Sequence, residues 1–323
     1  MFVDKVTVRC KAGRGGDGSC SFRREKFIPR GGPDGGDGGK GGDVIVIARD
    51  KVPHLGGIRN LSTFRAGHGE SGGKSRKFGK GGEDSIIEVP AGTRVTDKET
   101  GEELADLIAN GQKFVVAKGG KGGKGNVHFA TPTNRVPQRS DPGLDGDEIG
   151  IKLELFIPAD AAIMGLPWSG KSAIHRKLTG SNPRHSGFEF ATRNPHIGVC
   201  VVNPYSRFTI LDLPSLCDGS SEGQGLGNKF LKHLRRASIN IFVLDASSPT
   251  PPKEQMEIIK REVAAFDPSQ LEKRSIVVLT KSDLAEKEPK GIKRLKPMCI
   301  NAETGEGIPA LIETIAVMLG LEM

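Results

Sequence analysis

The feature that most constrains this fold is a strand–loop–helix pattern in the middle of the chain. The apolar run Ala161–Met164 leads into Gly165, and after four further residues come Gly170, Lys171 and Ser172. This G-x-x-x-x-G-K-S spacing is typical of a phosphate-binding loop, in which glycines let successive backbone N–H groups point at phosphate oxygens. The helix that follows adds the partial positive charge of its N-terminus. The pattern predicts an α/β sheet with a nucleotide at the end of this strand.

Glycine usage divides the chain into two regions. Of the 45 glycines, 32 precede residue 159 and 13 follow it, which predicts a glycine-rich domain at 1–158 and a second domain at 159–323. The first region contains three glycine tracts, Gly13–Gly42, Gly67–Gly82 and Gly119–Gly125. Glycine at about every third position allows polyproline-II-like segments to pack backbone against backbone. Composition alone also permits disorder, but the tracts are short, non-repetitive and joined to strand patterns, which favours order.

Apolar patterns predict the secondary structure of both regions. In the first region, strands are predicted at Phe2–Arg9, Asp43–Ala48, Ser85–Val89, Lys113–Ala117 and Ile149–Phe156, with a hairpin turn at Asp97–Gly101. In the second, strands are predicted at Ala161–Met164, Val199–Asn203, Phe208–Leu211, Ile239–Asp245, Ile276–Thr280 and Met298–Ile300. Helices are predicted from Gly170 onward and at Leu226–Ala237, Lys253–Ala265 and Ile308–Leu319. This alternation indicates a mostly parallel, doubly wound sheet.

Charge and cysteine content restrict the partners and the compartment. The formal net charge is +8, and basic residues lie in or beside the glycine tracts: Arg23, Arg24, Lys26, Arg30, Lys74, Arg76, Lys77, Lys80, Lys118, Lys121 and Lys124. On loops held by strands they would reach a phosphate backbone, and solvated loop charges are the alternative. Five scattered cysteines without a C-x-x-C pair fit a reducing cytoplasm and argue against a zinc site. The sequence has no apolar stretch of about 18 residues, so we expect no membrane span.

Three further segments follow the ends of predicted strands, where α/β sheets bind their ligands. They are Asp212–Ser215, Thr280–Asp283 and Asn301–Glu303. In the first segment, the carboxylate of Asp212 can bind the hydration shell of a Mg²⁺ ion. In the second, a carboxylate can accept two hydrogen bonds that guanine offers and adenine does not, while the third can present a backbone N–H to the guanine oxygen. Their order after the phosphate loop favours GTP, and a P-loop kinase or ATPase is the alternative.

Longer segments resemble the Obg (CgtA) family of translational-factor-related GTPases. They are Phe22–Gly36 (FRREKFIPRGGPDGG), Gly119–Arg135 (GGKGGKGNVHFATPTNR) and Gly225–His233 (GLGNKFLKH). The resemblance covers essentially the whole chain. It implies a β-rich, glycine-tract (polyproline-II-like) Obg domain on a β-barrel, followed by an α/β P-loop GTPase domain.

The same resemblance implies a function. We expect slow, Mg²⁺-dependent hydrolysis of GTP to GDP and phosphate, acting as a switch in the assembly of the large ribosomal subunit. The expected partners are GTP or GDP and the ribosomal RNA of the large subunit, which the basic glycine-rich loops would contact. A cytoplasmic monomer is expected.

The resemblance also assigns roles to individual residues. The expected catalytic residues are Lys171, Thr192 and Asp212, and the expected Mg²⁺ ligands are Ser172 and Thr192. Thr192 ends the segment Phe188–Thr192, which resembles switch I. The full set of expected nucleotide-binding residues is Gly165, Leu166, Pro167, Trp168, Ser169, Gly170, Lys171, Ser172, Ala173, Phe190, Ala191, Thr192, Asp212, Leu213, Pro214, Ser215, Thr280, Lys281, Ser282, Asp283, Asn301, Ala302 and Glu303.

Three positions that depart from related GTPases affect the expected chemistry. Trp168 stands where the family usually has an Asn that helps to hold a monovalent cation, which an indole coordinates poorly. Ser215 replaces the glycine of switch II, and its Cβ limits the backbone turn. Leu216 stands where Ras-type enzymes place the glutamine that orients water, and its side chain forms no hydrogen bond. We therefore expect slow intrinsic turnover raised by the ribosome, and the alternative is a nucleotide-holding ribosome-binding factor with decayed hydrolysis.

Overall fold

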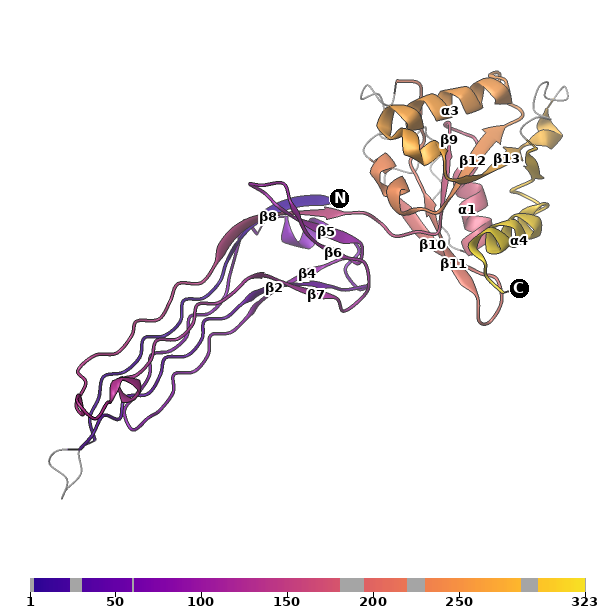
Figure 1. The fold of residues 1–323 in the computed structure, drawn as a ribbon. Coiled ribbons are helices and arrows are strands. Elements are labelled where there is room, and N and C mark those ends of the chain that lie inside the picture. The colour runs from indigo at the N-terminus through magenta and orange to yellow at the C-terminus, as the bar shows by residue number, and fades with distance from the viewer. Residues whose placement is uncertain are drawn as a thin grey trace. The chain divides into compact units, whose positions relative to one another are not determined.

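The computed structural model describes residues 3–23, 31–59, 61–180, 195–219, 230–285 and 296–322. The chain divides into two compact units, Met1–Leu155 and Phe156–Met323 (Figure 1). Unit 1 holds two β-sheets and the glycine tracts, and unit 2 holds a sheet with helices on its faces. None of the described helices has the length and apolar content that a membrane crossing requires.

Two β-sheets form the base of unit 1. The five-stranded sheet, in the order β3-β1-β8-β5-β6, contains β1 (Lys5–Lys11), β3 (Thr63–Arg65), β5 (Thr93–Asp97), β6 (Glu103–Leu107) and β8 (Glu148–Leu155). The three-stranded sheet, in the order β4-β2-β7, contains β2 (Val44–Ala48), β4 (Ser85–Val89) and β7 (Lys113–Ala117). Short 3₁₀ helices lie at η1 (Leu55–Ile58) and η2 (Asn126–Phe129). Among the described residues the strands form two separate sheets, so the closed β-barrel expected from the resemblance is not seen.

The central pair of the larger sheet follows from period-two alternation. In β1, Val6, Val8 and Cys10 are buried while the residues between them are exposed, and in β8 Ile151 and Leu153 are buried while their neighbours are half-buried. Because side chains alternate between the faces of a strand, these residues form one apolar face. β1 and β8 are antiparallel neighbours. The five strands predicted in this region are therefore confirmed within a few residues, whereas β3, β5 and β6 were not predicted; the predicted turn at 97–101 joins β5 to β6.

The glycine tracts run side by side along an arm that leaves the two sheets (Figure 1). We call residues 12–20, 31–43, 66–84 and 118–147 the glycine arm. Its segments are joined by backbone hydrogen bonds, such as Gly13 N–H to the Gly42 carbonyl (2.9 Å) and Gly42 N–H to the Gly67 carbonyl (2.9 Å). A Cβ on Gly13 would lie 1.8 Å from the Gly67 oxygen. Only glycine permits backbones to approach so closely, and the polyproline-II-like conformation of these segments stays a prediction.

Short polar side chains accept hydrogen bonds from backbone N–H groups of the glycine arm. The Asp43 carboxylate accepts from the Gly119 N–H (2.7 Å), and that of Asp37 accepts from the Gly125 N–H (2.7 Å). The Asn126 side chain is fully buried; it accepts from the Gly35 N–H (2.8 Å) and donates to the carbonyls of Ser21 (2.9 Å) and Pro137 (3.3 Å). Buried backbone groups need partners, so these side chains complete the hydrogen bonding of the arm.

Unit 2 is built on a six-stranded sheet in the order β10-β11-β9-β12-β13-β14. Its strands are β9 (Ala161–Gly165), β10 (His196–Val201), β11 (Arg207–Asp212), β12 (Ile239–Asp245), β13 (Arg274–Thr280) and β14 (Met298–Ile300). Its helices are α1 (Lys171–Thr179), α3 (Pro252–Phe266) and α4 (Ile308–Leu319), with 3₁₀ turns at η4 (Lys232–Arg236), η5 (Pro268–Leu271) and η6 (Ser282–Leu284). β10 and β11 are antiparallel and the other neighbours are parallel.

This layout confirms the predicted doubly wound sheet. The predicted helix at 226–237 is only partly described, and its described part contains the 3₁₀ helix η4. Figure 1 shows α1 and α4 on one side of the sheet and α3 on the other. Ile174 of α1 and Leu311 of α4 pack with strand residues in one fully buried cluster. Because β11, β9, β12, β13 and β14 are parallel, their carboxyl ends lie at one edge of the sheet, and the loops of the candidate site follow these ends.

Candidate nucleotide site

The phosphate loop connects β9 to α1 and closes around the ammonium group of Lys171. The Lys171 Nζ donates to the Leu166 carbonyl (2.7 Å) and to the Ser215 hydroxyl (2.9 Å), and it lies 3.5 Å from the Ser169 hydroxyl. The Lys171 side chain is buried. Burial lowers the pKa of this ammonium to about 8, and the Asp212 carboxylate opposes that shift. The structure thus places a buried cation among the loop oxygens.

Two loop residues have left-handed backbones, for different reasons. Gly170 has φ +84° at the start of α1, a conformation that costs glycine nothing. Trp168 has φ +65°, which is unusual for a bulky residue. Its side chain is 56% exposed, so the indole is not held by packing into a core. The loop holds Trp168 in this conformation through its backbone.

A hydrogen bond between the side chains of Ser172 and Asp212 connects the start of α1 to the end of β11. The Ser172 hydroxyl donates to the Asp212 carboxylate over 2.8 Å, and Asp212 is buried at the end of β11. The segment after β11 is tied to the strand that precedes the phosphate loop: Leu213 N–H donates to Ile163 (3.3 Å), and Leu216 N–H donates to Gly165 (3.1 Å). Hydroxyl and carboxylate oxygens form a donor set that suits the hard cation Mg²⁺. The predicted Mg²⁺ ligand Thr192 lies outside the described residues, as do Phe190 and Ala191.

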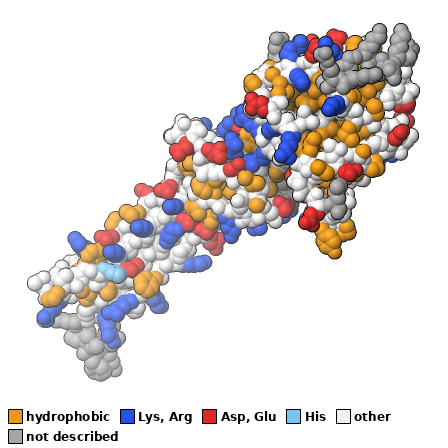
Figure 2. All heavy atoms as spheres, turned by 45° about the vertical axis from the view of Figure 1, so that its right-hand side comes forward, with side chains coloured by type: hydrophobic (Ala, Val, Ile, Leu, Met, Phe, Trp, Pro, Cys, Tyr) orange, Lys and Arg blue, Asp and Glu red, His pale blue; other side chains and the backbone are white. Residues whose placement is uncertain are grey.

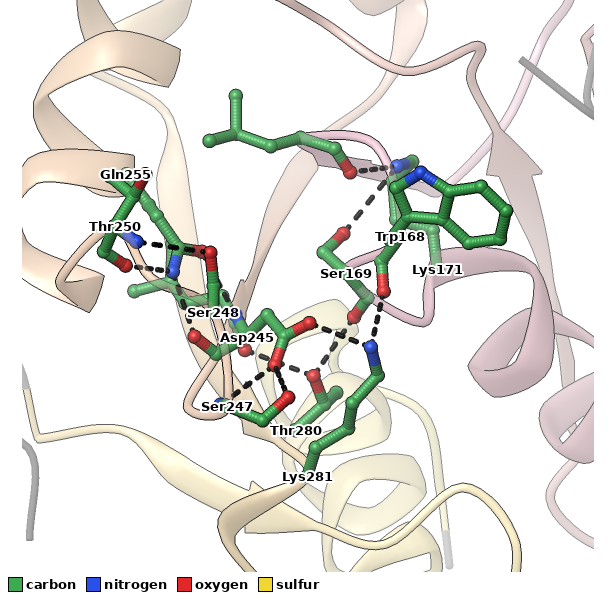
Figure 3. Close-up of polar contacts among 12 residues, drawn as sticks. Trp168, Ser169, Lys171, Asp245, Ser247, Ser248, Thr250, Gln255, Thr280 and Lys281 are labelled. Atoms are coloured by element: carbon green, nitrogen blue, oxygen red, sulfur yellow. Dashed lines mark hydrogen bonds and ion pairs between the residues drawn. The ribbon is translucent and has the colours of Figure 1, made fainter. Parts of the chain in front are cut away.

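The loop after β13 contacts the phosphate loop from the other side. The Thr280 hydroxyl donates to the Ser169 carbonyl (2.9 Å), and the Lys281 Nζ donates to the Trp168 carbonyl (2.8 Å) and to the Asp245 carboxylate (2.7 Å) (Figure 3). The predicted guanine segment and the phosphate loop therefore meet through side-chain-to-backbone bonds. Lys281 itself has φ +53°, and its ammonium bridges two neighbouring loops.

Asp245 is a residue of the site that sequence reasoning missed. It ends β12, and its carboxylate also accepts from the Ser247 N–H (2.8 Å) and hydroxyl (2.7 Å). Gln255 of α3 fixes the Asp245 backbone, accepting from its N–H (2.9 Å) and donating to its carbonyl (2.7 Å) (Figure 3). An Asp at the carboxyl end of a buried parallel strand was the available signal, the same one that identified Asp212.

The remaining predicted guanine residues share the sheet edge without bonding to the phosphate loop. Ser282 and Asp283 are exposed in η6. Asn301 follows β14 and folds its side chain back onto the N–H groups of Glu303 (2.9 Å) and Thr304 (3.1 Å). Within the described part of the chain, no hydrogen bond joins the 301–303 segment or Asp283 to the phosphate loop. Their reading of guanine stays a prediction.

Comparisons with known proteins cover both units. A family model described as GTP1/OBG matches residues 3–157, and one described as 50S ribosome-binding GTPase matches residues 160–281. The GTPase Obg of Acetivibrio thermocellus is 42% identical, over 97% of this chain and 76% of its own length. The GTPase Obg of Chloroherpeton thalassium is 43% identical, over 98% and 96%. Among solved structures, an Era variant from Aquifex aeolicus bound to GDP and aluminium fluoride has 24% identity and a TM-score of 0.40, over 50% of this chain and 56% of its own.

The extent of the two curated matches is decisive, because each spans both units at more than 40% identity. The family model of the first region and the GTPase model of the second follow each other in the same chain. The predicted GTP-hydrolysing activity is thereby confirmed. The chain belongs to the Obg family of GTPases.

Proposed function

We propose that this GTPase acts as a switch in the assembly of the large ribosomal subunit, with GTP or GDP held at the candidate nucleotide site. The observation that carries the nucleotide part is the presence of two hydrogen-bonded pairs at one sheet edge, Lys171 with Ser215 and Ser172 with Asp212. Lys171 would neutralise the β- and γ-phosphates, and Ser172 with Thr192 would hold Mg²⁺. When bound, the metal would offset charge that develops on the phosphates.

The protein's own residues would divide the remaining tasks. The N–H groups of the loop 165–172, with the N-terminus of α1, would bind the phosphates. Lys281 would lie over the base, because its ammonium is anchored between Trp168 and Asp245. The residues after Asp212 belong to switch II, and their conformation would depend on whether the γ-phosphate is present. The proposed domain boundary near residue 158 separates this machinery from the glycine arm.

Slow intrinsic hydrolysis follows from the residue after Ser215. Leu216 is 1% exposed and offers no polar side-chain atom to a water molecule. Its N–H is bound to the Gly165 carbonyl, which holds the segment against the phosphate loop. Single-turnover hydrolysis of GTP, with and without purified large ribosomal subunits, tests this reading. We expect a marked acceleration by the subunits, and equal fast rates in both arms would contradict it.

The glycine arm supplies the proposed ribosomal contact. Figure 2 shows basic side chains along it, and Lys118, Lys121 and Lys124 are exposed without an ion pair to any described residue. Loops that carry exposed lysines suit a phosphate backbone. The 50S ribosome-binding description of the family model that matches residues 160–281 supports a ribosomal partner for the chain, although that model does not cover the arm. This partner and a cytoplasmic, monomeric state are our proposal.

Co-sedimentation with large subunits tests the arm. Replacing Lys118, Lys121 and Lys124 by Ala should weaken binding and flatten its salt dependence, because fewer counterions are released. The matched control removes three exposed lysines from the base of unit 1, Lys5, Lys98 and Lys113. Equal loss in both triple variants would show a general charge effect and contradict a specific role of the arm.

A further inference from the structure

The Lys171–Ser215 hydrogen bond joins the phosphate loop to the segment that follows β11. The bond is 2.9 Å long and joins the buried ammonium to a hydroxyl supplied by the segment after β11. That segment is positioned on both sides of Ser215, by the N–H of Leu213 on Ile163 (3.3 Å) and the N–H of Leu216 on Gly165 (3.1 Å). The hydroxyl is therefore held at Lys171 by the backbone around it.

The geometry sets up a competition at the ammonium group. An ammonium has three protons: the Leu166 carbonyl (2.7 Å) and the Ser215 hydroxyl (2.9 Å) accept two of them, and the Ser169 hydroxyl lies at 3.5 Å as the weak partner of the third. The lysine of a phosphate loop has to reach the β- and γ-phosphates when GTP is bound. A β-phosphate oxygen, which GTP and GDP share, can replace the long Ser169 contact. A γ-phosphate oxygen at hydrogen-bonding distance from Nζ would then need the place that the Ser215 hydroxyl takes. GDP has no such oxygen, so it leaves this contact undisturbed.

We propose that Ser215 sets the preference of this site between GTP and GDP, because its hydroxyl holds Lys171 and has to leave before the γ-phosphate can bind. An alanine at this position offers no acceptor, so the Ser215 hydroxyl weakens GTP binding and leaves GDP binding unchanged. The inference rests on the proposed function, in which GTP occupies the candidate nucleotide site.

The test compares Ser215→Ala, Ser215→Thr and the wild-type protein. Ser215→Ala keeps the Cβ and removes the hydroxyl, whereas Ser215→Thr keeps both. Calorimetric titration with GDP and with GMPPNP, each with Mg²⁺, gives the dissociation constants. Trp168, the sole tryptophan of the chain, provides an independent fluorescence readout at the phosphate loop.

Ser215→Ala should bind GMPPNP about five- to tenfold more tightly and GDP within about twofold of wild type, the effect of one charge-assisted hydrogen bond partly replaced by water. Ser215→Thr should stay near wild type for both. An unchanged GMPPNP-to-GDP ratio in Ser215→Ala would overturn the inference, and so would a Thr variant that behaves like the Ala variant. Failure of the folded wild-type protein to bind either nucleotide would instead reject the proposed site, and thermal unfolding of each variant confirms its fold.

Discussion

The packing of the glycine arm makes a sharp prediction at two adjacent glycines. A Cβ on Gly82 would lie 2.1 Å from the Gly67 oxygen and 2.8 Å from the Gly42 nitrogen. A Cβ on Gly81 would find one neighbour, the Lys40 oxygen, at an ordinary contact distance of 3.6 Å. Neither glycine has a positive φ. Gly82→Ala and Gly81→Ala therefore differ in available space and hardly at all in backbone conformation.

The expected magnitudes follow from these distances. Real Cβ contacts are longer than 3.0 Å. The Gly82→Ala substitution therefore has to push the backbone at residue 82 away from the backbone at Gly67 by about 0.9 Å. That movement would stretch the bonds from Gly82 N–H to Lys40 (2.8 Å) and from Gly42 N–H to Gly67 (2.9 Å). Each bond contributes roughly 1 kcal/mol and strain adds to the loss, so we expect the arm to lose about 2–4 kcal/mol. Gly81→Ala should instead stabilise it by about 0.4–1 kcal/mol through the unfolded chain.

Hydrogen exchange measured by mass spectrometry on peptides spanning 67–84 separates the two outcomes. A loss of 2–4 kcal/mol corresponds to exchange that is roughly 30- to 900-fold faster in Gly82→Ala. Gly81→Ala should exchange at the wild-type rate or more slowly. Equal protection in both variants would refute the reasoning, because it would mean that the segments are not packed at the distances of this structure.

Three other predictions concern single positions. Asn126→Asp should destabilise the arm by about 2–4 kcal/mol, because a carboxylate oxygen would face the two carbonyls that the amide now donates to; urea unfolding followed by hydrogen exchange measures this. Trp168→Asn should raise the unfolding free energy of unit 2 by about 0.5–1 kcal/mol in calorimetry, because asparagine tolerates a positive φ, and a lower value would contradict backbone strain. Cys10, whose pKa burial raises to about 12, should resist iodoacetamide at pH 8.5 while the exposed Cys20 and Cys299 react, as peptide mass spectrometry would show.

Local sequence patterns predict elements whose burial is either continuous or periodic. β12 and α4 have the predicted bounds, because β12 is a continuous buried run and α4 has a clear helical face. β5 was missed, since Thr93–Asp97 has a single aliphatic side chain and its pairing is supplied by β6 and β8. Strand pairing of this kind is a tertiary effect that propensity does not encode.

The same limit applies to the site. The phosphate-loop residues were predicted because they are adjacent in the sequence, and their spacing is itself the signal. The Asp245–Lys281 ion pair joins residues 36 positions apart. It exists because β12 and β13 are parallel neighbours, with Asp245 opposite Thr280 in the register. A local motif search has no access to that register, so Asp245 could be found only by examining the end of every predicted strand.

Two glycines of the phosphate-loop motif are required for different physical reasons, and one of those reasons recurs in the arm. Gly170 is needed for its φ of +84°. Gly165 has no positive φ, but a Cβ there would lie 2.5 Å from the Val243 oxygen and 2.8 Å from the Ser169 hydroxyl. Gly165 is therefore needed for close approach, as Gly82 is in the arm. Because Leu216 donates to the Gly165 carbonyl, an alanine at this position would displace the phosphate loop together with the segment that brings Ser215 to Lys171.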